Sequence, residues 1–226
     1  MCFINCHLAA GQTQTKDRNN DISTILDNSV FPAERDHSVR QDSYIGGGDG
    51  TMILDHEICI LNGDLNYRID TMNQLTVVQA VKNNNLSKLL ERDQLLASKR
   101  KNPWFKLRAF HELPITFSPT YKYDVGTDQY DSSEKKRAPA WCDRILYRGR
   151  DRIKQLDYQR HEVRASDHRP VTGSFEIVIK TISPKERAVK WEDLQRQLVE
   201  RKEKLANEAR SVIPILVPGY LELIYQ

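Results

Sequence analysis

The segment 58–68 constrains the fold most strongly, because an apolar run in it ends abruptly in small and charged residues. Residues 58–61, Ile-Cys-Ile-Leu, are typical of a buried strand, and Gly63 is a turn signal at its end. Asp64, Asn66 and Arg68 then follow at intervals of two. Since side chains two residues apart in an extended chain point to one side, the pattern predicts a polar site at a strand end, suited to an anionic ligand.

A second interpretation of the same residues is purely structural. Asp and Asn also close hairpins through Asx turns, so the spacing of Asp64 and Asn66 alone favours that simpler explanation. Two later segments change the balance. They are residues 137–146, Arg-Ala-Pro-Ala-Trp-Cys-Asp-Arg-Ile-Leu, and residues 166–171, Ser-Asp-His-Arg-Pro-Val.

Together with residues 63–68, these segments closely resemble the signature motifs of the inositol polyphosphate 5-phosphatases, in the same order along the chain. That family belongs to the metal-dependent superfamily that also holds the DNase I-like nucleases. The resemblance covers about residues 1–182. It implies a layered α/β sandwich of the DNase I-like, α+β kind. It also implies Mg²⁺-dependent hydrolysis of the 5-phosphate from phosphoinositides or soluble inositol polyphosphates.

The resemblance assigns catalytic roles to five residues. Residues 7–10, His-Leu-Ala-Ala, match a strand end whose histidine faces the scissile phosphate, so His7 takes that role. Asp64 is expected to orient or deprotonate the attacking water, and Asn66 to donate to a phosphoryl oxygen. Asp143 and His168 are expected to form a carboxylate–imidazole pair that holds the protonated ring against the phosphate.

The resemblance also implies residues for the metal and the substrate. Asp167 is expected to touch the metal or its waters. The residues expected to bind the phosphorylated substrate are Arg68, Tyr121, Lys122, Arg144 and Arg137. Tyr121 and Lys122 stand in a Tyr-Lys-Tyr-Asp stretch that, in the family, helps to read a neighbouring ring phosphate.

Charge composition argues against a nucleic-acid partner. Charged residues make up 29% of the chain, but the net charge is only +3. Local basic clusters at 135–137 and 148–152 carry more information than the total. We therefore expect an anionic small molecule or lipid headgroup as the ligand, a transient contact with a membrane surface, and no nucleic acid.

Four cysteines without a paired framework fit a reducing compartment. Cys2, Cys6 and His7 lack the second ligand pair of a typical zinc site, so we interpret the cysteines as core residues of a strand. No apolar run approaches the roughly 18 residues that a membrane span needs, and no signal peptide is visible. These features predict a soluble, cytoplasmic protein that acts peripherally at membranes.

The remaining periodicity predicts strands near 1–10, 143–147, 156–163 and 171–182, and helices near 18–28, 71–81 and 86–99. Periodicity fails over residues 31–55, which include a glycine-rich loop at 46–50, and we interpret this stretch as an insertion. The central strand at 58–62 follows it.

A helical extension is predicted over residues 183–210, followed by an apolar tail at 211–226 that could start another domain. Ser183, Pro184 and Glu186 form a strong helix start. Trp191, Leu194, Leu198 and Leu205 make a narrow stripe, so the helix can dock on the domain or on a protein partner.

The family carries a metal-binding glutamate and an asparagine on strands that precede the His-Leu-Ala-Ala strand. Residues 1–182 therefore match the C-terminal portion of the catalytic domain. This leaves two alternatives to a 5-phosphatase: another DNase I-like phosphodiesterase or nuclease, and an inactive phosphoinositide-binding fragment. The Trp-Cys-Asp-Arg and Tyr-Lys-Tyr-Asp stretches argue against a nuclease.

Overall fold

The computed structural model of the chain describes residues 1–216, with side chains described up to position 210. The chain divides into two compact units, Met1–Ile179 and Lys180–Gln226, which we describe separately. In the second unit, helix α6 covers Pro184–Leu216, and its Glu186 N–H donates to Ser183 Oγ at 3.4 Å. The helix thus continues past its expected end near 210, while the rest of the expected tail lies outside the described residues.

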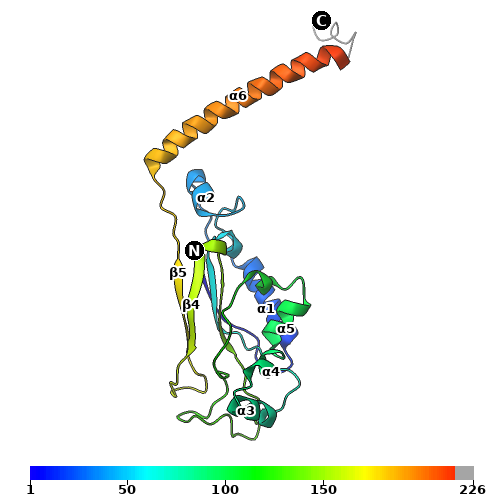
Figure 1. Cartoon of the computed structure of the whole chain (residues 1–226), viewed down its shortest axis with the longest axis vertical. Coiled ribbons are helices and arrows are strands. Elements are labelled where there is room, and N and C mark those ends of the chain that lie inside the picture. Colours follow the sequence, from blue (N-terminus) through cyan, green and yellow to red (C-terminus); the bar gives the residue numbers. More distant parts are fainter. Residues whose placement is uncertain (217–226) are drawn as a thin grey trace. The chain divides into compact units, whose positions relative to one another are not determined.

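A three-stranded sheet forms the centre of the first unit (Figure 1). Its strands are β1 (Cys2–His7), β2 (Cys59–Asp64) and β3 (Asp143–Arg148), in that spatial order. β1 runs parallel to β2, and β3 runs antiparallel to it. The register pairs His7 with Asp64 and Asp64 with Asp143. One end of the sheet therefore carries three of the predicted site residues in a single row.

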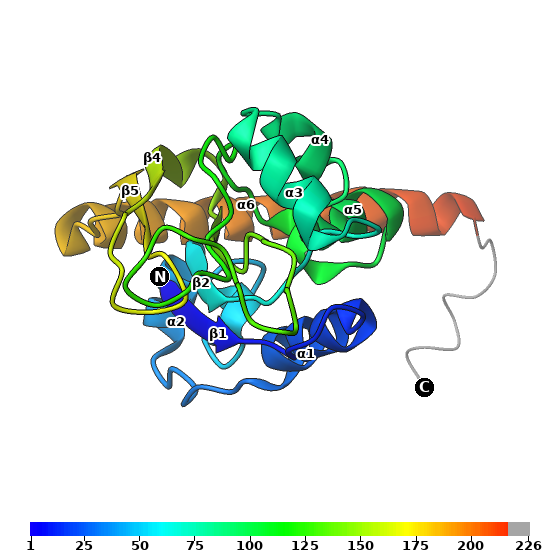
Figure 2. The same ribbon diagram turned by 90° about the horizontal axis from the view of Figure 1, so that it is seen from below.

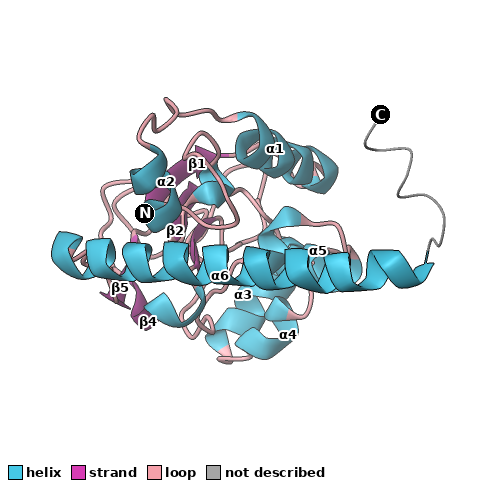
Figure 3. Ribbon diagram, turned by 90° about the horizontal axis from the view of Figure 1, so that it is seen from above, coloured by secondary structure: helices cyan, strands magenta, loops and turns pink. Residues whose placement is uncertain are grey.

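Helix α1 (Thr15–Asn28) covers one face of this sheet (Figure 3). Its Ile22 and Leu26 pack with Cys2, Cys6 and Leu61, all nearly or fully buried. This confirms the expectation that Cys2 and Cys6 are core residues of a strand. All four cysteines of the chain are free and buried.

The other face packs against helices α3 (Gln74–Lys82) and α4 (Leu86–Leu90) and against a second sheet. That sheet pairs β4 (Ile153–Arg160) with β5 (Val171–Ile177) in an antiparallel manner. Ile60, Trp141 and Ile145 contribute buried side chains to this second core. The layered α/β arrangement predicted from the sequence is present. β4 begins at Ile153, three residues earlier than expected, and β5 ends at Ile177, five residues earlier than expected.

The predicted helix at 86–99 is wrong in one respect, because the chain breaks it into two. Helix α4 ends at Leu90, and α5 covers Gln94–Lys101. Asp93 caps α5, since its carboxylate accepts the Leu96 N–H at 2.9 Å. Asp93 is also fully buried, so the residue that caps α5 belongs to the interior of the unit.

Short elements fill the remaining connections. The expected insertion at 31–55 contains helix α2 (His37–Ser43) and the 3₁₀ turn η1 (Ile53–Asp55). Two further 3₁₀ turns are η2 (Lys106–Ala109) and η3 (Arg150–Arg152). Among the described residues, no helix is both long and apolar enough to cross a bilayer.

We predict that Gly63→Ala destabilises the fold far more than Gly126→Ala. Gly63 has φ +133°, and an added Cβ would lie 2.1 Å from the Cys6 carbonyl oxygen, so a backbone must move. Gly126 has φ +80° but no atom within 4 Å of such a Cβ. We expect a loss of about 3 kcal/mol or more for Gly63→Ala and about 1 kcal/mol for Gly126→Ala. Urea unfolding followed by circular dichroism measures both, and equal losses would contradict the prediction.

Candidate functional site

Four predicted residues meet at the end of the central sheet. His7 ends β1, Asp64 ends β2 and Asp143 begins β3, while His168 comes from the connection between β4 and β5. His7 Nε2 lies 3.5 Å from Asp64 Oδ2, and His168 Nε2 lies 3.9 Å from the same oxygen. The four side chains are separated by up to 161 positions in sequence, yet they form one cluster of two imidazoles and two carboxylates.

Asp143 and His168 form the expected carboxylate–imidazole pair. The distance from His168 Nδ1 to Asp143 Oδ2 is 2.9 Å. A third group, which the sequence analysis did not select, completes this contact: Thr120 Oγ1 donates to the same carboxylate at 2.6 Å and is fully buried. Its hydroxyl also accepts the Asp143 N–H at 3.4 Å. The imidazole is thus oriented by a carboxylate that is itself held in place.

The surroundings shift the pKa values of two members of the cluster. Burial lowers the pKa of His168, but its hydrogen bond to Asp143 and the charges of Asp143, Asp64 and Asp167 outweigh this, so the net pKa is raised. Burial raises the pKa of Asp64, only partly offset by the nearby His168 charge. The site therefore favours a protonated imidazole beside a carboxylate that accepts protons more readily than usual.

The turn after β2 is an Asx turn, as the purely structural interpretation of Asp64 and Asn66 predicted. It does not close a hairpin. Asp64 Oδ1 accepts the Asn66 N–H at 3.0 Å, and Asn66 has φ +56°. The Asn66 side chain is buried. Its Nδ2 donates to the Leu8 carbonyl at 3.1 Å, and its Oδ1 accepts from Arg68. In this structure the Asn66 side chain supports the Asp64 turn from behind, and its expected contact with a phosphoryl oxygen stays a prediction.

Tyr121 links the histidine loop to the turn after β2. Its ring centroid lies 4.5 Å from that of His168 and 4.6 Å from the Arg68 guanidinium carbon. Its backbone pairs with both Ala140 and His168 as isolated antiparallel bridges. One segment thus aligns the imidazole loop, the start of β3 and the arginine after β2.

A cavity of about 560 Å³ is connected to this cluster through Tyr121, which lines the cavity and contacts the His168 ring, while His7, Asp64, Asp143 and His168 themselves do not line it. It contains three of the predicted substrate-binding residues, Arg68, Tyr121 and Arg137. The other residues that line it are Ala10, Gly11, Gln12, Met72, Asn73, Gln74, Lys135, Lys136 and Ala138. Four cationic side chains thus line a space large enough for a small ligand. The sequence analysis noted the basic cluster at 135–137 but selected only Arg137 from it.

Lys122 and Asp167 form an ion pair, with Lys122 Nζ 2.7 Å from Asp167 Oδ2. This contact gives Asp167, the expected metal ligand, a different partner. Across residues 1–216, no group of three or more His, Cys, Asp or Glu side chains is placed to hold a metal ion. The described residues therefore form no all-protein cage for a metal ion, whereas Mg²⁺ commonly binds through one or two carboxylates together with waters and substrate phosphates.

The expectation that Arg144 binds substrate is wrong. Arg144 is fully buried, on the opposite side of β3 from Asp143, and forms ion pairs with Asp93 at 3.0 Å and Glu112 at 2.7 Å. Its Nε and Nη2 atoms donate to the two carboxylate oxygens of Glu112, which makes this contact bidentate. Successive side chains of a strand point to opposite faces, and this rule could have predicted that Asp143 and Arg144 do not both face the site.

Comparison with known proteins places this site in context. Residues 1–174 match the family model described as endonuclease/exonuclease/phosphatase family 2. A probable inositol polyphosphate 5-phosphatase of Schizosaccharomyces pombe is 47% identical over the whole chain, which corresponds to 19% of that protein. Synaptojanin of Caenorhabditis elegans is 41% identical over 78% of the chain and 14% of its own length. The chain thus spans about a fifth or less of the curated relatives it matches.

A solved structure shares the fold. It is the inositol polyphosphate 5-phosphatase domain of SPsynaptojanin, in complex with inositol (1,4)-bisphosphate and a calcium ion. The TM-score is 0.69 at 35% identity, over 92% of this chain and 55% of that one. The mixed α/β fold described above is therefore that of the DNase I-like 5-phosphatase domain.

We predict that the Asp143 carboxylate raises the pKa of His168. Proton NMR of the ring should give a midpoint above 6.5, and Asp143→Asn should lower it. A raised folded-state pKa stabilises the fold below the unfolded pKa, and this contribution is lost as the pH rises through the folded pKa. Asp143→Asn should therefore destabilise the protein more at low than at high pH. Asp128→Asn, which removes a carboxylate paired with Arg164 instead, is the control.

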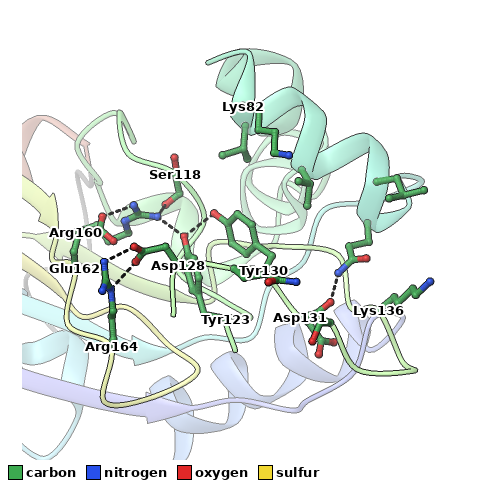
Figure 4. A pocket seen from close by; sticks show the side chains of 16 residues that line it. Lys82, Ser118, Tyr123, Asp128, Tyr130, Asp131, Lys136, Arg160, Glu162 and Arg164 are labelled. Carbon is green, nitrogen blue, oxygen red and sulfur yellow. Dashed lines mark hydrogen bonds and ion pairs between the residues drawn. The ribbon is translucent and has the colours of Figure 1, made fainter. Parts of the chain in front are cut away.

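We predict that Arg144→Met costs about 3–5 kcal/mol of folding free energy, because it leaves two buried carboxylates without their cation. The matched control is Arg164→Met, since Arg164 pairs with Asp128 at the surface (Figure 4), where such pairs contribute about 1 kcal/mol or less. Chemical unfolding of both variants measures the difference. A small loss for Arg144→Met would show that the buried ion pair is dispensable.

Proposed function

Because the chain belongs to the endonuclease/exonuclease/phosphatase family 2 and is similar to its inositol polyphosphate 5-phosphatases, we propose that it takes part in hydrolysis of the 5-phosphate of an inositol phosphate or phosphoinositide headgroup. The observation that carries the proposal is the cluster of Asp64, Asp143 and His168, which Tyr121 joins to a cavity lined by cations. Proton-transfer groups and anion-binding groups lie next to each other, as phosphate monoester hydrolysis requires.

In this proposal, Asp64 accepts a proton from the attacking water or orients it. Its raised pKa brings it closer to the range in which a carboxylate is an effective base. The raised pKa of His168 favours the protonated ring, in which Nδ1 donates to Asp143 and Nε2 carries the second proton, and Nε2 donates this proton to a phosphoryl oxygen as negative charge builds. His7, whose Nε2 also faces Asp64, provides a second contact on the same side.

The cavity supplies recognition of the rest of the ring. Arg68, Lys135, Lys136 and Arg137 place positive charge where further ring phosphates would lie, and Arg137 has the planar fork that pairs with phosphate oxygens. The Tyr121 ring forms part of the wall. Lys122, which pairs with Asp167 here, contributes to this subsite only after leaving that partner.

We propose Mg²⁺ as the divalent ion of the reaction, since the solved relative carries a calcium ion. A divalent ion stabilises charge on phosphoryl and leaving oxygens. The described residues do not assemble a complete set of ligands for it, so none of the steps above is assigned to the metal. A second candidate function is a fragment that binds phosphoinositides without hydrolysing them, for which the cations that line the cavity would suffice.

A lipid substrate would bring the protein to a membrane from the cytoplasm. We propose a peripheral and transient association, in which the cavity takes a headgroup from the bilayer surface. Helix α6, whose exposed stripe includes Trp191, Leu194 and Leu198, is a candidate surface for a protein partner.

We predict that Asp64→Asn and His168→Ala each lower phosphate release from inositol 1,4,5-trisphosphate by about 100-fold or more, because each removes a proton-transfer or charge-stabilising group. The assay should use this chain and, in parallel, a longer protein that contains it, each with Mg²⁺ and with a chelator. Asp128→Asn serves as the control variant. Wild-type rates in both site variants would contradict the assignment, whereas headgroup binding without hydrolysis in both wild-type proteins would favour the binding fragment.

A further inference from the structure

A fully hydrogen-bonded amide lies behind the walls of the 560 Å³ cavity. Gln94 on α5 is 1% exposed and does not line the cavity itself. Its Oε1 accepts from Arg18 Nη2 at 2.6 Å and from the Arg68 backbone N–H at 2.9 Å. Its Nε2 donates to the Gln12 carbonyl at 2.9 Å and to Asp70 Oδ1 at 2.6 Å. These four contacts use the full hydrogen-bonding capacity of a glutamine side chain.

One wall of the cavity is the loop that leaves β1, which lines it at residues 10–12. Viewed from below, β1 runs toward α1, and α5 lies beside α1 (Figure 2). Arg18 on α1 is fully buried and donates from Nη1 to the Ala9 and Gly11 carbonyls at 2.9 and 2.7 Å. Gln94 binds this guanidinium and the next carbonyl of the loop, that of residue 12. Side chains from two helices therefore hold the backbone of this wall.

Arg68 brings positive charge to the same cavity. Its Nε donates to the Asn66 carbonyl at 3.0 Å, and its guanidinium carbon lies 4.6 Å from the Tyr121 ring centroid. Its backbone N–H donates to Gln94. A displacement of the Gln94 amide would therefore move the backbone from which this cation projects. The cation and the loop wall share one buried anchor.

The contacts of Gln94 require an amide, because two of its partners are donors and two are acceptors. A carboxylate lacks the donors, and an apolar side chain of similar length lacks both, so either leaves polar groups unpaired. Helix α5 already has its cap in Asp93 and its core contact in Leu95, so the helix alone does not account for the amide. A buried network in which every group is paired keeps its members in one arrangement.

We propose that Gln94 is a positioning residue for phosphate recognition, which fixes Arg68 relative to the loop after β1 and so keeps this cation directed at ligand phosphates in the cavity. Gln94 itself does not touch the ligand. This role rests on the proposed function, since it names the residue that orients one of the cations assigned there to ring phosphates. Loss of the amide weakens ligand binding, while the cluster of Asp64, Asp143 and His168 keeps its own hydrogen bonds and its chemistry.

The test replaces the amide by an apolar side chain of similar length, in the two proteins used for the phosphate-release assay. Gln94→Met should raise the Kd for inositol 1,4,5-trisphosphate about tenfold, because Arg68 loses its fixed place; calorimetry with a chelator present measures this. KM should rise in parallel, whereas kcat should change by less than about twofold. The matched control is Ser98→Ala on the same helix, which removes a contact with Asn19 of α1 and should leave Kd and KM unchanged.

A double-mutant cycle shows whether the effect is transmitted through Arg68. In an Arg68→Met background, Gln94→Met should raise the Kd by less than about twofold, because the cation that Gln94 positions is gone. If Gln94→Met does not fold, Gln94→Glu takes its place, since its carboxylate still accepts from Arg18 and Arg68 but loses both donated hydrogen bonds. The same non-additivity is then expected.

An unchanged Kd in Gln94→Met would overturn the proposal, as would an equal rise in Ser98→Ala, because the effect would then be a general loosening of α5. An effect of full size in the Arg68→Met background, or a fall in kcat with unchanged KM, would also overturn it. If the wild-type protein binds inositol 1,4,5-trisphosphate without hydrolysing it, the proposed hydrolysis fails, while the Kd values still decide the role of Gln94. If it does not bind this ligand at all, both proposals fail.

Discussion

The register of the central strand β2 determines where every other part of the site lies. Because β2 pairs in parallel with β1 and in antiparallel with β3, His7, Asp64 and Asp143 occupy one row across the sheet. A shift of one residue in either pairing would turn one of these side chains to the opposite face. Gly63, paired with Cys6 one position before this row, allows the close approach of β1, since any side chain there would meet the Cys6 carbonyl.

The two faces of β3 separate chemistry from stability. Asp143 faces the site and shares its carboxylate between Thr120 and His168. Arg144, the next residue, faces the interior, where it joins Asp93 at the start of α5 to Glu112. The ion pairs that hold α5 against the sheet therefore start one residue from the carboxylate that contacts His168. A strand that carries both tasks tolerates few substitutions at either position.

The sequence indicated most of the layers and the central cluster, and its failures have physical causes. Apolar periodicity located β2, β3 and α3, and the motif around His168 predicted its pairing with Asp143. Periodicity could not show that Asp93 is buried and breaks a helix, because its partner Arg144 lies 51 positions away. It also could not show that Asn66 leaves the strand with positive φ, since spacing by two assumes an extended backbone. Thr120 was overlooked because its importance depends entirely on the carboxylate it touches.

The burial of all four thiols has a practical consequence. Burial raises the pKa of Cys6 to about 11, and it raises the pKa of Cys2, Cys59 and Cys142 as well, so few thiolates exist near neutral pH. Alkylating reagents and mild oxidants react with thiolates and need access to them. The native cysteines should therefore not react with maleimide dyes. A single cysteine placed on the surface would then carry a fluorophore or spin label while all four native cysteines remain in place.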